Sequence, residues 1–192
     1  MYKIGVSGNI GSGKSELINF ISKLGFECIS SDYIISKLYE NKNTRKLILT
    51  RLNLGEKKYK QEIINKLHNE EFNRLLKKTL YPLLYSRKKI ISKKHIKHQP
   101  IFYEVPLLHE EKLYQDYDVT IFVMADFNKR MQRVLNRGVS KNYFKLMNNK
   151  QINENIKKIK STFTINNNGS ILNLRLNAIR LLNQLWEKLF LT

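Results

Sequence analysis

Cysteine is almost absent from this chain, since Cys28 is the single one among 192 residues. No disulfide can form within the chain, which excludes the small disulfide-stapled secreted proteins. Long apolar runs are lacking as well, and no stretch approaches the roughly 20 residues that a membrane-spanning helix needs. The first residues also lack the basic segment and long apolar segment of a signal peptide. We therefore expect a cytoplasmic protein with no membrane partner.

Acidic residues are few, with 16 Asp and Glu against 35 Lys and Arg, so the formal net charge is +19. Such a charge attracts polyanions, and a nucleic-acid-binding protein is one interpretation. The lysines are spread over the whole chain, however, and the basic runs contain no interleaved aromatic residues. This pattern favours compositional drift over a nucleic-acid surface. We expect no specific nucleic-acid partner.

Glycine is scarce too, but three of the eight glycines stand in one stretch with the sequence GNIGSGKS. This is the G-x-x-x-x-G-K-S pattern of a phosphate-binding loop, or P-loop. The glycines let backbone N–H groups approach phosphate oxygens, Lys14 would bring a positive charge to the β- and γ-phosphates, and Ser15 would ligate Mg²⁺ through its hydroxyl. The expected nucleotide-binding residues of the loop are Gly8, Asn9, Ile10, Gly11, Ser12, Gly13, Lys14 and Ser15.

The segments on either side support this interpretation of the loop. Residues 2–6 are typical of a buried strand, and residues 16–24 carry apolar side chains at helical spacing. A strand, a glycine loop and a helix N-terminus together form the geometry that binds anions. The alternative is a chance glycine loop between a strand and a helix, and the flanking segments disfavour it.

Further apolar runs indicate an α/β fold. Strands are predicted at residues 26–29, 101–105, 119–124 and 163–165, and helices follow most of them. This alternation predicts a parallel sheet covered by helices. The last predicted helix, residues 170–190, has an expected apolar face that includes Leu174, Ile179, Leu182 and Trp186.

Two segments do not fit the alternation. Residues 40–99 are basic, have helical spacing and contain no convincing strand, so we expect a helical insertion that holds a second substrate. Pro82 predicts a kink or a new helix start within this insertion. Residues 138–160 are polar, with little potential to form a core, and they suit a mobile lid. The predicted nucleotide-binding core is therefore residues 1–39 and 100–192.

Charged residues follow several of the predicted strands. Asp32 would lie near the phosphates if its strand neighbours the first one, or it would merely cap the next helix, and the residues alone favour neither. Glu104 would hold Mg²⁺ through water or would be an exposed charge at a strand end. Arg133 and Arg137 share a helix face, which suits either a phosphate clamp or an ordinary basic surface.

Taken in order, these segments resemble dephospho-coenzyme A kinases, a family of P-loop kinases, over nearly the whole chain. The resemblance is carried by Gly5–Ser15, Leu24-Gly25, Ser31-Asp32, Val105-Pro106-Leu107-Leu108 with Glu110, Arg133-x-x-x-Arg137 and Ile165-x-Asn167-Asn168-Gly169. It implies a three-layer P-loop kinase fold with a helical acceptor-binding insertion and a lid.

The resemblance also implies an activity. An enzyme of this family transfers the γ-phosphate of ATP to the ribose 3′-hydroxyl of dephospho-coenzyme A, with Mg²⁺ as the cofactor. Asp32 matches the aspartate thought to accept the hydroxyl proton, and Arg137 matches a lid arginine on the phosphates. Asn168 and Gly169 match the turn beside the adenine. The implied partners are ATP and dephospho-coenzyme A, and we expect a monomer or a small homo-oligomer.

Some positions depart from the family pattern. Tyr81-Pro82 stands where the family usually has His-Pro, and Glu154 stands where it has a lid arginine. Ser161-Thr162 replaces a common Ala-Asp pair, and Gln61 or Glu62 replaces an arginine. As a hypothesis, Lys150 or Lys157 substitutes for the lost lid charge. The alternative functions are another P-loop kinase for nucleosides or nucleotides, and a basic nucleic-acid-binding protein that binds ATP.

Overall fold

The computed structural model describes residues 2–93 and 99–190, the latter without the side chain of residue 190. Contacts divide the chain into two compact units, residues 1–30 with 96–192, and residues 31–95. We call them the sheet unit and the helical unit. The sequence placed the start of the helical insertion at residue 40, whereas the contacts place the division directly after the second strand.

The sheet unit contains five parallel strands in the order β2-β3-β1-β4-β5. The strands are β1 (Lys3–Gly8), β2 (Glu27–Ser30), β3 (Ile101–Glu104), β4 (Val119–Met124) and β5 (Phe163–Asn166). Because all five are parallel, their carboxyl ends meet at one edge of the sheet, where ligands bind in open α/β folds. The predicted parallel α/β fold is therefore confirmed.

The second strand is not a neighbour of the first, because β3 lies between them. All four residues of β3 are buried, as a strand needs to be when it is covered on both faces. In β2, only Ile29 is buried, which suits the edge of the sheet. The sequence placed Asp32 near the phosphates on the condition that the second strand lies beside the first. The strand order does not meet that condition.

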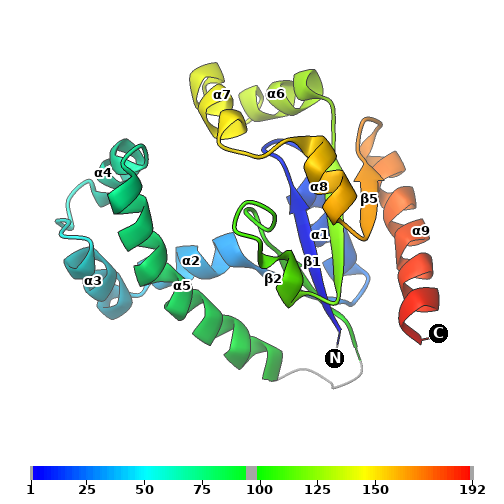
Figure 1. The fold of residues 1–192 in the computed structure, drawn as a ribbon, viewed down its shortest axis with the longest axis horizontal. Coiled ribbons are helices and arrows are strands. Elements are labelled where there is room, and N and C mark those ends of the chain that lie inside the picture. Colours follow the sequence, from blue (N-terminus) through cyan, green and yellow to red (C-terminus); the bar gives the residue numbers. More distant parts are fainter. Residues whose placement is uncertain (1, 94–98, 191–192) are drawn as a thin grey trace. The chain divides into compact units, whose positions relative to one another are not determined.

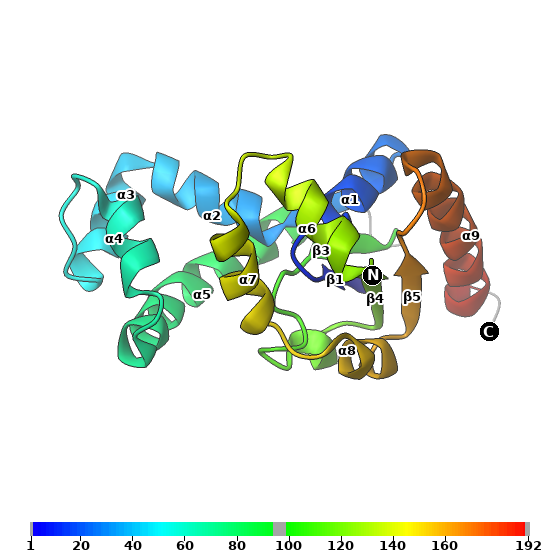
Figure 2. The ribbon, with the colours of Figure 1, turned by 90° about the horizontal axis from the view of Figure 1, so that it is seen from above.

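Helices cover both faces of this sheet. The helices of the sheet unit are α1 (Lys14–Lys23), α6 (Phe127–Leu135), α7 (Lys141–Asn149), α8 (Glu154–Lys160) and α9 (Ile171–Phe190), with a short 3₁₀ helix at Leu113–Asp116. Helix α9 packs against α1 and β5, and α8 contacts β4. Figures 1 and 2 show α1 and α8 on opposite sides of the sheet, with α6 and α7 beyond its carboxyl edge.

Helix α9 buries only part of the apolar face that the sequence suggested, since Leu174 is buried and Leu182 packs against the core. Leu174, Ala178, Leu181 and Leu185 are buried against the sheet, at spacings of four, three and four residues. Ile179 is 43% exposed and Trp186 is 55% exposed, so neither belongs to the buried face. The sequence alone did not distinguish the two apolar stripes of this helix.

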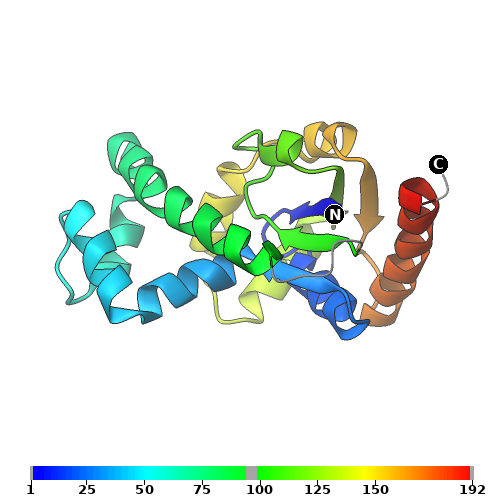
Figure 3. The same cartoon turned by 90° about the horizontal axis from the view of Figure 1, so that it is seen from below.

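The helical unit consists of α2 (Ser31–Glu40), α3 (Lys42–Arg51), α4 (Tyr59–Lys66) and α5 (Glu70–Lys93). Helices α2, α3 and α5 pack on one another around buried leucines and isoleucines, and Figure 3 shows α5 in green beside α2 and α3 in blue and cyan. Helix α5 continues through Pro82, so no new helix starts there. Helical spacing in the sequence predicts this helix over residues 70–96, of which residues 94–96 lie outside the described residues.

In residues 2–93 and 99–190, no helix combines the length and the apolar character that crossing a bilayer requires.

Phe102 on β3 provides a test of the sheet core. Its side chain is completely buried and meets Phe26 edge-on at a ring distance of 5.6 Å. We expect Phe102→Ala to lower the free energy of unfolding by about 3–5 kcal/mol, because the cavity loses dispersion contacts. Urea unfolding followed by circular dichroism and by Trp186 fluorescence measures the change. Leu172→Ala, at a residue that is 65% exposed, should change it by less than about 0.5 kcal/mol.

Candidate nucleotide-binding site

The glycine loop runs from the carboxyl end of β1 into α1, and its backbone requires glycine at two positions. Gly11 and Gly13 have φ angles of 78° and 93°, in the left-handed region. Space is also short, because a Cβ on Gly13 would lie 2.1 Å from Nδ2 of Asn167, and one on Gly11 would lie 2.4 Å from the carbonyl oxygen of Arg130. The two glycines therefore set both the shape of the loop and its tight packing.

Backbone donors of this loop remain available for a ligand. Within the described part of the chain, the N–H groups of Gly11, Gly13, Lys14 and Ser15 make no hydrogen bond. They stand at the N-terminus of α1, where the partial positive charge of the helix favours an anion. These donors are available where the sequence placed the phosphates, and phosphate binding by the loop stays a prediction.

Glu104 joins the two functional side chains at the end of the loop. Its Oε1 accepts hydrogen bonds from Lys14 Nζ at 2.8 Å and from Ser15 Oγ at 2.7 Å. Glu104 is only 5% exposed, so the exposed strand-end charge that we considered for it is wrong. Burial alone would raise the pKa of this carboxyl, but Lys14 and the hydrogen bonds from Ser15 and Ser30 outweigh it, and the pKa is lowered.

These residues fit a magnesium ion. Mg²⁺ prefers hard oxygen ligands and keeps several waters. The hydroxyl of Ser15 and an ionised carboxylate of Glu104 are two such oxygens, and they lie within hydrogen-bonding distance of each other. Glu104 is held where the sequence placed a possible magnesium carboxylate, at the carboxyl end of β3 beside the loop.

The two arginines that share the predicted phosphate clamp have different environments. Arg133 donates from Nη2 to the carbonyl of Asn167 at 2.8 Å, and from Nη1 to the carbonyls of Gly11 and Ser12 at 3.4 Å. It therefore supports the back of the loop. Arg137 follows the end of α6 rather than lying within it, is exposed, and makes no side-chain hydrogen bond or ion pair with any described residue.

The turn after β5 lies at the same edge of the sheet. Asn167 donates from Nδ2 to the carbonyl of Ser12 at 2.7 Å, and its own N–H bonds the carbonyl of Met124. Asn168 exchanges two hydrogen bonds with Asp126, through the Asp126 N–H at 2.8 Å and through the Asp126 carboxylate at 2.7 Å. Gly169 is packed closely against Asn173. The role of Asn168 and Gly169 beside an adenine stays a prediction.

The predicted lid contains more buried residues than its polar sequence suggested. Phe144 of α7 is completely buried and packs on Phe127 at a ring distance of 5.3 Å. Lys157 of α8 is also completely buried and bonds Asn9 Oδ1 at 2.6 Å and Glu110 Oε1 at 2.5 Å. The expectation of little core potential in residues 138–160 was therefore wrong, because partners from the loop and from α6 supply what the segment lacks.

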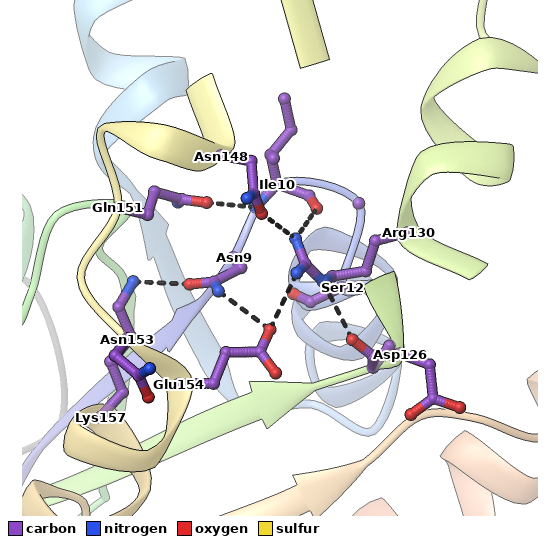
Figure 4. Close-up of polar contacts among 12 residues, drawn as sticks. Asn9, Ile10, Ser12, Asp126, Arg130, Asn148, Gln151, Asn153, Glu154 and Lys157 are labelled. Carbon is purple, nitrogen blue, oxygen red and sulfur yellow. Dashed lines mark hydrogen bonds and ion pairs between the residues drawn. The ribbon is translucent and has the colours of Figure 1, made fainter. Parts of the chain in front are cut away.

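Arg130 and His109 are both buried, and the sequence assigned no role to His109. It grouped Arg130 with Arg133 and Arg137, as part of either a phosphate clamp or a basic helix face. In the structure, Arg130 contacts the loop and the lid (Figure 4). His109 bonds Ser7 Oγ at 3.2 Å and Ser161 Oγ at 2.9 Å. Burial, followed by the nearby positive charge of Lys157, lowers the pKa of His109 to about 4. A histidine directly after Val-Pro-Leu-Leu was the available signal.

Asp32 belongs to the other unit. It lies in the first turn of α2, and its side chain is exposed. Its acidic position at a helix N-terminus is favourable for the helix dipole in any case. The proposed catalytic role of Asp32 therefore still depends on the sequence.

The parallel sheet and the glycine loop between β1 and α1 define a P-loop protein with the kinase fold. The family model described as dephospho-CoA kinase matches residues 2–173. The chain belongs to the dephospho-CoA kinase family, and the resemblance drawn from the sequence is confirmed.

Individual relatives agree with this assignment. A dephospho-CoA kinase of Rickettsia typhi is 29% identical over 189 residues, which cover 96% of this chain and 98% of the relative. The crystal structure of TT1252 from Thermus thermophilus has a TM-score of 0.82 at 24% identity and covers 95% of this chain and 96% of that one. A dephospho-CoA kinase from Campylobacter jejuni has a TM-score of 0.64 at 23% identity, with the same coverage. These two structures share the fold.

Gly13 offers a test of the loop with a matched control. Gly13 and Gly25 both have φ of 93°, but a Cβ on Gly25 would meet nothing within 4 Å. Gly25→Ala should therefore cost only the left-handed strain, about 1–2 kcal/mol of stability, and leave ATP affinity unchanged. Gly13→Ala adds the collision with Asn167 and should weaken Mg-ATP binding at least about tenfold. Calorimetric titration measures both, and equal ATP affinities for the two variants would contradict the steric account.

His109 predicts a pH dependence of stability. Its folded pKa of about 4 lies below its ordinary value of 6.5, so the unfolded chain binds the proton more readily. The stabilisation is complete above pH 6.5 and is lost as the pH falls towards 4, by up to about 3 kcal/mol. We expect urea unfolding at several pH values to show this slope. His109→Phe should be less stable at pH 7 but should have a flatter profile between pH 6.5 and 4, and parallel profiles would exclude His109 as the cause.

Proposed function

We propose that this protein transfers the γ-phosphate of ATP to the ribose 3′-hydroxyl of dephospho-coenzyme A and so completes coenzyme A. The observation that carries the proposal is the family match over residues 2–173. The loop geometry supports the donor half, because free N–H groups, Lys14 and Ser15 stand together at the N-terminus of α1.

In the transfer, the 3′-oxygen of the acceptor forms a bond to the γ-phosphorus while the bond to the β–γ bridging oxygen breaks and ADP leaves. Loop N–H groups hold the phosphates, and Lys14 neutralises charge that builds on them. Ser15 and Glu104 would hold Mg²⁺, which supplies further positive charge to the phosphates when bound. Glu104 already holds Lys14 and Ser15, so these three side chains need little rearrangement.

Three further roles carry over from the family pattern. Asp32 accepts the proton of the 3′-hydroxyl as it attacks, which is the task of a positioned general base. Arg137 is exposed and adds charge on the donor phosphates. Asn168 and Gly169 line the adenine, in a turn that hydrogen bonds to Asp126 already hold in place.

The helical unit is proposed to bind the acceptor. Its departures from the family pattern, at Tyr81 and at Gln61 or Glu62, lie on α5 and α4. Tyr81 packs edge-on against Tyr85 at a ring distance of 6.2 Å. A cytoplasmic location and a monomeric or small homo-oligomeric state complete the proposal.

Two other functions have less support. Another P-loop kinase, for a nucleoside or nucleotide acceptor, would use the same loop but is opposed by the family match. A nucleic-acid-binding ATP-binding protein is favoured only by the charge of +19. Within the described chain, the most buried cations, Arg130 and Lys157, are engaged with protein partners rather than exposed to a polyanion.

A phosphotransfer assay with purified protein and Mg-ATP tests the proposal against these alternatives. Dephospho-coenzyme A should stimulate ADP release far more than a panel of nucleosides and nucleoside monophosphates. Lys14→Ala should abolish the turnover and serves as the control for contaminating kinases. Turnover with a nucleoside monophosphate and none with dephospho-coenzyme A would overturn the assignment. Steeply salt-dependent RNA binding without acceptor-stimulated turnover would favour the third function.

Asp32→Asn tests the proposed base. The amide keeps the size and a hydrogen-bonding oxygen but cannot take a proton at neutral pH. We expect kcat to fall by about 10²–10⁴ while the affinity for ATP, measured by titration, stays unchanged. If turnover remained near normal, Asp32 would act only at the N-terminus of α2.

A further inference from the structure

Four buried or largely buried charges form a continuous series beside the glycine loop (Figure 4 shows three of them). Arg130 Nη2 lies 3.1 Å from Glu154 Oε1, and Lys157 Nζ lies 2.5 Å from Glu110 Oε1. The side chains of Arg130 and Lys157 are 5% and 1% exposed, and that of Glu110 is 10% exposed. We call Arg130, Glu154, Lys157 and Glu110 the charge series.

The amide of Asn9 connects the two ion pairs. Its Nδ2 donates to Glu154 Oε1 at 2.9 Å, and its Oδ1 accepts from Lys157 Nζ at 2.6 Å. A lysine can only donate and an ionised carboxylate can only accept, so the orientation of this amide is unambiguous. Asn9 is 6% exposed and is thus fixed at both ends by residues of α8.

The next two loop residues are held from the same side. The N–H of Ile10 donates to Gln151 Oε1 at 3.0 Å, and its carbonyl accepts from Arg130 Nη1 at 3.3 Å. Arg130 also donates to Asn148 Oδ1 and to the carbonyl of Ala125, and its own carbonyl limits the space at Gly11. The side chain of Asn9, the backbone of Ile10 and the space at Gly11 are therefore determined by α6, α8 and the connection between α7 and α8.

Such a series adds little net stability, because removing its charges from water costs free energy. Burial lowers the pKa of Lys157. It also lowers the pKa of Arg130, although the negative charge of Glu154 opposes this shift. Replacing a buried ion pair by apolar residues is often neutral or stabilising, so buried pairs contribute geometry more than stability. The geometry in this case is that of the glycine loop, whose free N–H groups belong to Gly11, Gly13, Lys14 and Ser15 in the described chain.

We propose that the charge series is a positioning device: acting through Asn9 and Ile10, it fixes the loop in the shape that receives the donor phosphates. In this role its members act on the loop and not directly on the nucleotide. The proposal rests on the nucleotide-binding half of the proposed function and not on the identity of the acceptor.

This role predicts a selective kinetic change. A loop that is no longer held samples other shapes, and only a fraction of molecules can bind ATP, so the apparent affinity falls by that fraction. Once ATP is bound, its phosphates impose the loop shape themselves. The KM for ATP should therefore rise, while kcat and the KM for the acceptor stay nearly constant.

The experiment separates positioning from stability by means of a neutral replacement. Lys157→Met leaves Glu110 buried without its partner and should lower the melting temperature. Lys157→Met with Glu110→Gln removes both charges, and the glutamine oxygen can still accept from the Ile152 N–H as Glu110 does. The double variant should regain most of the melting temperature, yet its KM and Kd for Mg-ATP should stay raised about tenfold, since Asn9 has lost its partner.

Three comparisons make the outcome decisive. Lys23→Met, the same substitution at an exposed residue in the last turn of α1, should leave every value unchanged. Glu154→Gln, which removes the charge opposite Arg130, should also raise the Kd for Mg-ATP. In an Asn9→Ala background, Lys157→Met should weaken ATP binding little further, because both act through the same amide.

Recovery of melting temperature and ATP affinity together in the double variant would overturn the proposal, since the series would then be a stabilising element only. A fall in kcat with unchanged ATP affinity would overturn it as well. Calorimetric ATP binding needs no acceptor, so a wrong acceptor assignment would not affect this result.

Discussion

The structure depends on how closely two other segments approach the glycine loop. The space above Gly11 is filled by the backbone of Arg130, and that above Gly13 is filled by the side chain of Asn167. A Cβ at either position would separate segments that are far apart in the sequence. Strand β1, helix α6 and the turn after β5 therefore meet only because side chains are missing at these points. The free N–H groups of the loop follow from the same constraint, since no protein acceptor reaches them in the described chain.

The charged residues at the glycine loop are arranged differently from those of the chain as a whole. The chain carries a surplus of 19 positive charges, yet the charges that define the site are few and paired. Glu104 orders Lys14 and Ser15 at the front of the loop, and Arg133 bonds loop carbonyls behind it. The exposed lysines make a generally basic surface. The buried pairs determine the geometry of the glycine loop. Net charge alone therefore suggested a nucleic-acid partner, whereas the local arrangement of charges suggests a nucleotide.

The sequence predicted the glycine loop, the five strands and the helical character of residues 40–93, because each of these depends on local patterns: glycine spacing, apolar runs and helical periodicity. It did not predict that β3 would separate β2 from β1, since strand order depends on which strand buries both faces. It missed the burial of Arg130, His109 and Lys157 for a related reason. Each of these side chains is polar and forms hydrogen bonds with side chains that lie at least 18 residues away along the chain. The roles of Asp32 and Arg137 depend on the family pattern, because no contact that would assign a catalytic role to either residue is seen in the described chain.

The order β2-β3-β1-β4-β5 has one more consequence. Strands β2 and β3 are parallel neighbours, so the chain between them must return along the length of the sheet, which requires at least a dozen residues in any such pair. Residues 31–95 are therefore an enlarged form of a connection that the fold requires anyway. Residues can be exchanged or added there without altering any ladder of the sheet, and two of the four departures from the family pattern, at Tyr81 and at Gln61 or Glu62, lie there. A change in this connection therefore leaves the strand pairing, and the glycine loop that follows β1, as they are.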